Sequence, residues 1–112
     1  MELVVADHDA ATRLVTLIGR LDALGADQVE HRFAAAVQAD RHALVDLSQV
    51  PFVGSLGLRM LISLARSMQR RGRRMVLFGA DPLVQGIFDT VALGDLIPIA
   101  ADREAALARL AD

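Results

Sequence analysis

The residue with the clearest capacity for chemistry is Ser55, which stands between glycines in the stretch Gly54-Ser55-Leu56-Gly57. A strand-like run over 43–47 precedes this stretch, and an amphipathic helical pattern follows it. A serine at the first turn of a helix can cap free backbone N–H groups. It can also accept a phosphoryl group, because those N–H groups and the helix dipole stabilise added negative charge. Ser55 is therefore predicted to be a helix cap or a phosphorylation site.

Other chemistries have little support in the sequence. Ser55 lacks the G-x-S-x-G frame of a hydrolase nucleophile, and the nearby glycines do not form a phosphate-binding loop. The chain has no cysteine, and its three histidines lie in unrelated segments without the spacing of metal ligands. We therefore expect a protein that is not an enzyme, without catalytic residues, metal or cofactor.

Length and composition predict one domain over residues 1–112, with 54% hydrophobic residues to build its core. A net charge of −2 gives no general reason to expect binding to nucleic acid. No segment reaches the roughly 18 apolar residues of a membrane span, and the start lacks the basic region of a secretory signal. We expect a cytoplasmic protein that does not insert into a membrane.

The elements around Ser55 alternate between strands and helices. Two strands, over 3–6 and 12–19, are expected to form a hairpin before a helix that begins near Ala26. From Ala43 onward the order strand, helix, strand, helix, strand, helix predicts mostly parallel pairing. The sequence thus predicts an α/β fold with a mixed, mostly parallel sheet of about five strands, an antiparallel N-terminal strand and about four helices. The later strands are expected over 43–47, 75–78 and 96–99, with helices after Gly54, after Asp81 up to Gly94, and after Asp102.

The helix after Ser55 has more apolar surface than contact with a sheet requires. Met60 and Leu64 widen its apolar stripe, and either a neighbouring helix or a partner protein could cover them. The stripe itself consists of Leu58, Leu61, Ile62, Ala65 and Met68. The opposite narrow side gathers Arg59, Ser63, Arg66 and Arg70. The arginines near the helix end, Arg66, Arg70, Arg71, Arg73 and Arg74, are predicted to form a solvated face that complements the dipole.

Two acids fall near the carboxyl ends of predicted strands, where ligands collect in α/β sheets. They are Asp22, after the second strand, and Asp46, in the third. Either they lie near Ser55 or they are turn and cap residues, and the sequence leaves both interpretations open.

The residues from Asp46 to Leu58 resemble the signature D-L-S-x-V-x-F-x-D-S-[ST]-G-L of the STAS domain, which occurs in bacterial anti-sigma-factor antagonists. In this chain they read D-L-S-Q-V-P-F-V-G-S-L-G-L. The segment Gly19-Arg20-Leu21-Asp22 is similar to the G-x-L-D ending of the family's second strand. The resemblance implies a STAS fold over essentially the whole chain and a role in signal transduction and transcription regulation through protein binding.

The resemblance also implies a phosphorylation switch. In the family, the unmodified antagonist binds a serine kinase that acts as an anti-sigma factor, which frees the sigma factor, and the phosphorylated antagonist releases the kinase. Ser55 would be the phosphoacceptor, and the central helix would belong to the docking face. The residues expected near the phosphosite are Asp22, Gly54, Leu56 and Gly57, and those expected to contact the partner are Leu58, Arg59, Met60 and Leu64.

Two departures from the signature keep a second hypothesis open. Gly54 stands where the family has an acid, and Leu56 stands where it has a hydroxyl residue. The alternative is a STAS accessory subunit that never carries phosphate, in an ABC-type lipid transport complex or a stress-signalling assembly. Its partner would then be a transporter ATPase subunit.

Overall fold

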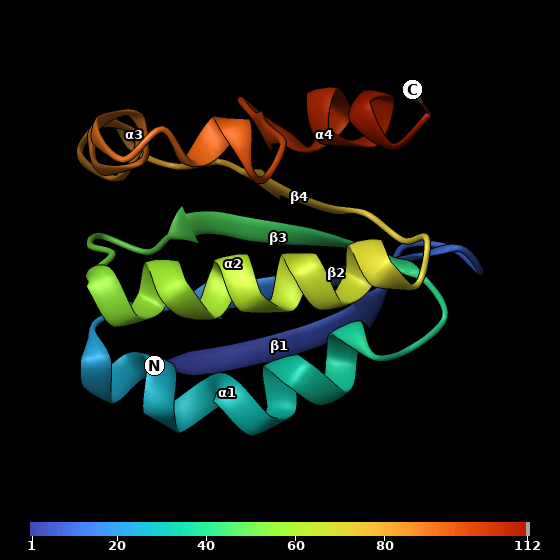
Figure 1. Cartoon of the computed structure of the whole chain (residues 1–112), viewed down its shortest axis with the longest axis horizontal. Helices are drawn as coiled ribbons and strands as arrows, with labels where there is room; N and C mark the ends of the chain where they lie inside the picture. The colour runs from blue at the N-terminus through green and yellow to red at the C-terminus, as the bar shows by residue number, and fades with distance from the viewer. Residues whose placement is uncertain (112) are drawn as a thin grey trace.

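The strands of the sheet follow one another in chain order, β1-β2-β3-β4-β5 (Figure 1). The structure, a computed structural model, describes residues 1–111. β1 runs antiparallel to β2, whereas the three other neighbouring pairs are parallel. This confirms the predicted α/β fold with a mixed, mostly parallel sheet. The elements are β1 (Glu2–Asp7), β2 (Thr12–Ile18), α1 (Ala23–Val37), β3 (His42–Gln49), α2 (Ser55–Arg70), β4 (Met75–Phe78), α3 (Pro82–Thr90), η1 (Leu93–Asp95), β5 (Ile99–Ala100) and α4 (Arg103–Leu110).

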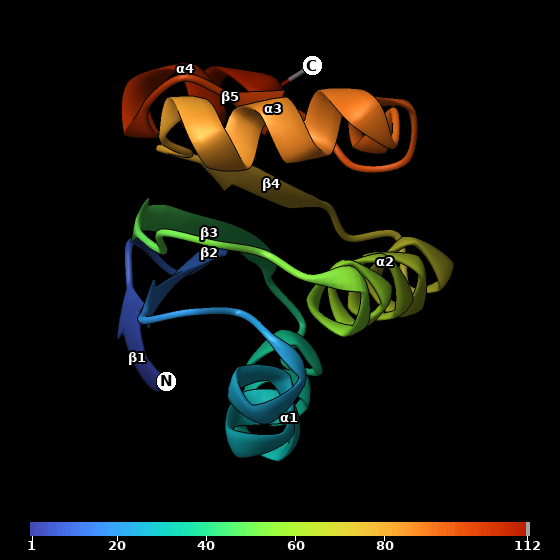
Figure 2. The same cartoon turned by 90° about the vertical axis from the view of Figure 1, so that its left-hand side faces the viewer.

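Helices cover both faces of the sheet (Figure 2). α1 and α2 lie on one face, where their buried residues join those of α3 in one large core. α4 packs on the other face, where Ala106 meets Leu44, Val76 and Phe78 in a smaller core. All of β4 is buried, because successive side chains of a strand point to opposite faces and both faces are covered here. In the part of the chain that the structure describes, no helix is long and apolar enough to cross a membrane.

The last strand is shorter than the sequence predicts. The expected strand over 96–99 is reduced to the two residues of β5, and the 3₁₀ turn η1 comes before it. α3 also ends at Thr90 rather than near Gly94. Ala92 adopts a left-handed backbone with a φ of 53°, which a right-handed helix cannot continue. The polypeptide therefore turns before it reaches the glycine.

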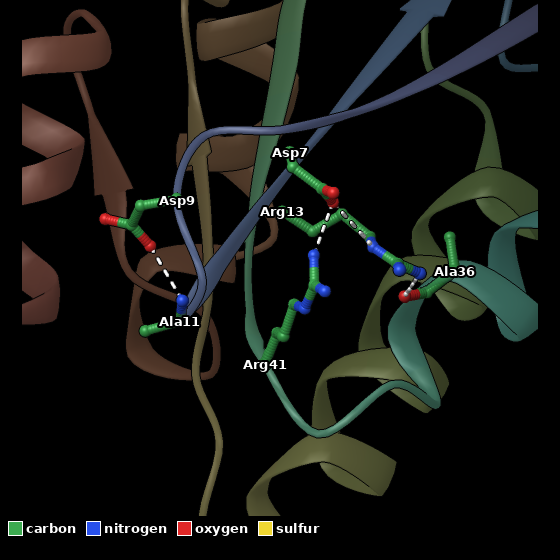
Figure 3. A network of polar contacts seen from close by, with 6 residues as sticks. All are labelled: Asp7, Asp9, Ala11, Arg13, Ala36 and Arg41. Carbon is green, nitrogen blue, oxygen red and sulfur yellow. Dashed lines mark hydrogen bonds and ion pairs between the residues drawn. The ribbon is translucent and has the colours of Figure 1, made fainter.

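Arginines organise the end of the molecule where α1 finishes. Asp7, the last residue of β1, accepts a hydrogen bond from Arg41 and lies 3.5 Å from Arg13 Nε (Figure 3). Arg13 also donates to the carbonyl of Ala36 at 3.2 Å. The last carbonyls of a helix have no partner inside the helix, so cationic donors there satisfy them and complement the dipole.

Three of the arginines at and after the end of α2 are at least partly exposed, as expected for a solvated face, and they also make hydrogen bonds to neighbouring elements. Arg71 donates to the carbonyls of Val37 at 2.8 Å and Gln38 at 2.9 Å, at the end of α1. Arg73 donates to Asp40 at 2.8 Å. Arg74 donates to the carbonyl of Arg109, in α4, at 3.1 Å. The end of α2 is thereby tied to both α1 and α4.

His42 makes the fold sensitive to pH. Its Nδ1 accepts a hydrogen bond from the backbone N–H of Arg74 at 3.0 Å. Burial lowers the pKa of His42 below its usual 6.5, and the charges of Arg73 and Arg74 lower it further. The unfolded chain therefore takes up this proton at a higher pH than the folded chain does.

We expect the free energy of unfolding to be fully retained above about pH 6.5 and to decrease as the pH falls from there through the lowered pKa. Urea unfolding at a series of pH values between about 7.5 and 5 measures this change. His42→Gln removes the titrating ring and should flatten this part of the curve. An equally steep decrease in the variant would contradict the assignment.

Candidate functional site

The site is built on a single contact between two connecting segments. Beyond the ends of β2 and β3, Leu21 and Val53 form an isolated parallel bridge. The N–H of Leu21 donates to the carbonyl of Phe52 at 2.9 Å, and the N–H of Gly54 donates to the carbonyl of Leu21 at 2.9 Å. Because α1 and α2 start directly after these segments, the bridge sets the two helix N-termini side by side.

Asp22 lies at this junction as the N-cap of α1. Its carboxylate accepts a hydrogen bond from the N–H of Gly25 at 2.8 Å and lies 3.5 Å from Arg20 Nε. The Gly25 hydrogen bond is the main cause that lowers the pKa of Asp22, and Arg20 adds to it. The guanidinium of Arg20 also stacks 4.5 Å from the ring centre of Phe52. Asp22 is thus a negative charge beside the start of α2.

Ser55 is the first residue of α2 and not its N-cap, which corrects the prediction that it caps the helix. Gly54 is the N-cap and supplies no side-chain hydrogen bond, and the first recorded bond of the helix runs from Leu58 N–H to Gly54 O. The N–H groups of Ser55, Leu56 and Gly57 precede that bond and have no intrahelical acceptor. Ser55 is exposed, and no hydrogen bond of its hydroxyl is recorded among the described residues. The hydroxyl therefore stands free beside unpaired donors.

The residues flanking Ser55 differ in the space around them. A Cβ at Gly54 would come no closer than 3.4 Å to the Phe52 ring, so an acid could be accommodated there. A Cβ at Gly57 would lie 2.5 Å from the carbonyl oxygen of Leu21, which no real side chain permits. Leu56 is 44% exposed. Packing therefore does not require a glycine at position 54, where the family has an acid. Packing does require a glycine at position 57.

A groove of about 510 Å³ runs along the exposed side of α2 from Ser55. Leu58 and Ile62 are half-buried in it, and arginines from three successive parts of the helix border it. The lining residues are Ser55, Leu58, Arg59, Ile62, Ser63, Arg66 and Arg70. We refer to these residues as the α2 groove.

The structure separates the four predicted partner-binding residues into two pairs. Leu58 and Arg59 line the α2 groove. Met60 is only 6% exposed and lies on the side of α2 that faces α1, beside Ala23 and Ala26. Leu64 is half-buried and packs against the main core. Met60 is therefore covered by the neighbouring helix, which was one of the two alternatives for its apolar surface.

Asp46 is not part of the site. Its carboxylate accepts a hydrogen bond from the N–H of Ser48 at 2.9 Å and lies beside Gly79, at the ends of β3 and β4.

The predicted partner contacts did not include three residues that line the groove, Ile62, Arg66 and Arg70. The spacing of Arg59, Arg66 and Arg70 along one narrow side of the helix did predict their shared location.

Fold and site together define a class: a small α/β binding domain with an exposed serine at a helix start and a groove beside it. The sequence matches the STAS domain over residues 3–106, and the chain belongs to this family. BtrV of Bordetella bronchiseptica, which carries the name of an anti-sigma factor antagonist, is 29% identical over 96 residues, or 85% of this chain and 83% of BtrV.

Solved structures agree with this fold. An anti-sigma factor antagonist from Mycobacterium paratuberculosis superposes with a TM-score of 0.88, at 24% identity, over 99% of this chain and 94% of that chain. The Bacillus cell fate determinant SpoIIAA in its phosphorylated form superposes with a TM-score of 0.70, at 20% identity, over 96% of this chain and 98% of that chain. The chain is thus a STAS protein similar to anti-sigma factor antagonists, and it is a binding protein rather than an enzyme.

Gly57 packs so closely against Leu21 that a substitution at this position tests the junction between the segments before α1 and α2. Gly57→Ala should lower the free energy of unfolding by about 2 kcal/mol or more, because overpacking outweighs the better helix propensity of alanine. Gly86→Ala is the matched control, since it adds the same methyl group inside α3 with nothing within 4 Å. This control should gain up to about 1 kcal/mol. Urea unfolding of both variants measures the difference, and a stabilised Gly57→Ala protein would contradict the junction as described.

Proposed function

We propose that this chain is an anti-sigma factor antagonist that binds a serine-kinase anti-sigma factor and is released when Ser55 is phosphorylated. The observation that carries the proposal is the exposed hydroxyl of Ser55 at the first position of α2, at one end of the α2 groove. Family membership and the name of BtrV support the antagonist role. In the transfer, Ser55 Oγ gives up its proton to a base of the kinase and forms a bond to the γ-phosphorus of ATP, while the bond from that phosphorus to its bridging oxygen breaks and ADP leaves.

A phosphate on Ser55 is compatible with the fold. The free N–H groups of the first turn and the positive end of the helix dipole stabilise it in place. The modification adds roughly two negative charges to a surface that the partner covers. Burying such a charge against a partner costs several kcal/mol unless it is paired, so the phosphate changes recognition rather than folding.

The docking face that we propose comprises the α2 groove together with Leu56. Leu58 and Arg59, predicted from the sequence as partner contacts, both belong to it. Because position 54 is a glycine, Asp22 is the acid beside the start of α2, and we propose that it is the acid near the phosphosite. The kinase reaches this face in the cytoplasm.

Ser55→Glu should prevent capture of the serine kinase from the cells of origin, with affinity lowered by about 3 kcal/mol, or roughly a hundredfold. Ser55→Ala should bind the kinase as the native protein does but accept no phosphate. Thr90→Glu is a matched control, because it replaces another exposed hydroxyl residue with an acid on α3, outside the groove. Affinity capture with mass spectrometry identifies what the native protein and the three variants bind, and titration of the purified kinase then gives the affinity of each.

Two outcomes would contradict the proposal. Equal capture of the kinase by the native and Ser55→Glu proteins would refute the switch. Capture of transporter ATPase subunits by both proteins, with no kinase, would instead support the accessory-subunit hypothesis that Gly54 and Leu56 keep open.

A further inference from the structure

The positive charge of this protein is concentrated on α2. The helix sequence SLGLRMLISLARSMQR contains three arginines and no acid, although the whole chain has a net charge of −2. Arg59, Arg66 and Arg70 all border the α2 groove. The positive field along this helix attracts negatively charged surfaces, although the net charge of the whole molecule is negative.

These three arginines differ from those that follow the helix. Arg71 and Arg73 are held by hydrogen bonds to α1 and to Asp40. For Arg59, Arg66 and Arg70, no ion pair or side-chain hydrogen bond is recorded among residues 1–111. Arg66 and Arg70 are also four residues apart, a spacing at which like charges repel and destabilise a helix. An acidic group placed between them would remove this repulsion.

The arginines border an apolar floor. Leu58 and Ile62 are half-buried within the groove, and Ser55 lies at its end. From Leu58 to Arg70 the helix rises about 18 Å, the length of roughly three helical turns. The surface therefore suits an elongated partner segment that carries both apolar and acidic side chains.

The other border of α2 has the opposite charge. A smaller groove between α1 and α2, of about 240 Å³, is lined by Asp27 and Glu30 of α1. Arg59 and Ser63 line both grooves and so lie on the boundary between them. A negatively charged partner is repelled from the α1 side and is directed to the arginine side.

We propose that the α2 groove binds an acidic amphipathic helix of the partner protein, whose carboxylates pair with Arg59, Arg66 and Arg70 and whose apolar side chains cover Leu58 and Ile62. Two helices packed nearly side by side share the same rise per residue, so acids spaced seven and four residues apart can meet all three arginines. This inference rests on the proposed function, because it names the chemistry of the surface through which the kinase would dock. It also gives the phosphate on Ser55 a direct effect: the added charge repels an acidic partner at the end of the groove.

The test uses synthetic helical peptides as the probe and the full chain as the receptor. One peptide carries Leu at the apolar positions and Glu at the seven-and-four spacing, a second replaces each Glu with Lys, and a third replaces each Leu with Ser. Amide chemical-shift titration locates the binding surface, and fluorescence anisotropy gives the affinity. We expect the Glu peptide alone to bind the native protein, with shifts confined to α2.

Charge reversal provides the discriminating variants. The double variant Arg66→Glu/Arg70→Glu should bind the Glu peptide about a hundredfold more weakly than the native protein does. It should bind the Lys peptide more tightly than the native protein does. Arg109→Glu is the matched control, because it reverses an exposed arginine on α4, outside the groove, and it should leave both affinities unchanged. Arg66→Gln/Arg70→Gln, which only removes the charges, should show a smaller loss and covers the case in which the double reversal does not fold.

Several results would overturn the inference. One is equal affinity of the native protein for the Glu and Lys peptides. Another is a loss of affinity in Arg109→Glu as large as that in the double charge reversal. A third is tighter binding of duplex DNA or anionic lipid vesicles than of the Glu peptide.

This test can fail independently of the test of the proposed function. If native and charge-reversed proteins capture the kinase equally, the antagonist role survives and the acidic-helix inference fails. If the Glu peptide binds α2 but no kinase is captured, the acidic-helix inference survives and the antagonist role fails.

Discussion

The structure of the site depends on the pairing of Leu21 with Val53. The Leu21 carbonyl accepts the N–H of Gly54, and the Leu21 N–H donates to Phe52, so the segment before α1 and the segment before α2 are joined as a short extension of the sheet. The side chain of Leu21 is fully buried, and Gly57 packs directly against it. Any other residue at position 57 would push α2 away from this contact. The orientation of Ser55 at the start of α2 is therefore fixed by backbone bonds of a residue far away in the sequence.

The same packing divides α2 into surfaces with different roles. One side contacts the sheet through Leu61, Ala65 and Met68, and another contacts α1 through Met60. The remaining side is the α2 groove, which begins at Ser55 and continues along the arginines. Because the helix is anchored along its length and at both ends, the proposed phosphate at its first residue would alter the charge of this surface without altering the helix. A switch of this kind acts through electrostatics at the docking face, where an unpaired charge is costly.

Sequence patterns were sufficient for the order of elements, the mixed sheet and the placement of three groove arginines on one side of α2. The elements and the side of α2 that carries the arginines follow from local periodicity, and the mixed sheet follows from the order of strands and helices. The exact role of Ser55 was not accessible in this way. The sequence predicted Ser55 as the cap, whereas Gly54 takes this position in the structure, where its N–H donates to the carbonyl of Leu21 in the segment before α1. The burial of Met60 similarly depends on where α1 passes, and the length of β5 depends on where Pro98 bonds to Leu77. Long-range contacts decided these three features.

The most direct test of the account is to map the phosphate and measure its effect on one preparation. The native protein is incubated with its purified serine kinase and ATP, the modified residue is identified by mass spectrometry, and the affinity for the kinase is titrated before and after. The account predicts that Ser55, alone among the four serines of the chain, carries the phosphate and that the affinity falls by roughly a hundredfold. A phosphate on Ser48, Ser63 or Ser67, or an unchanged affinity after modification of Ser55, would contradict it.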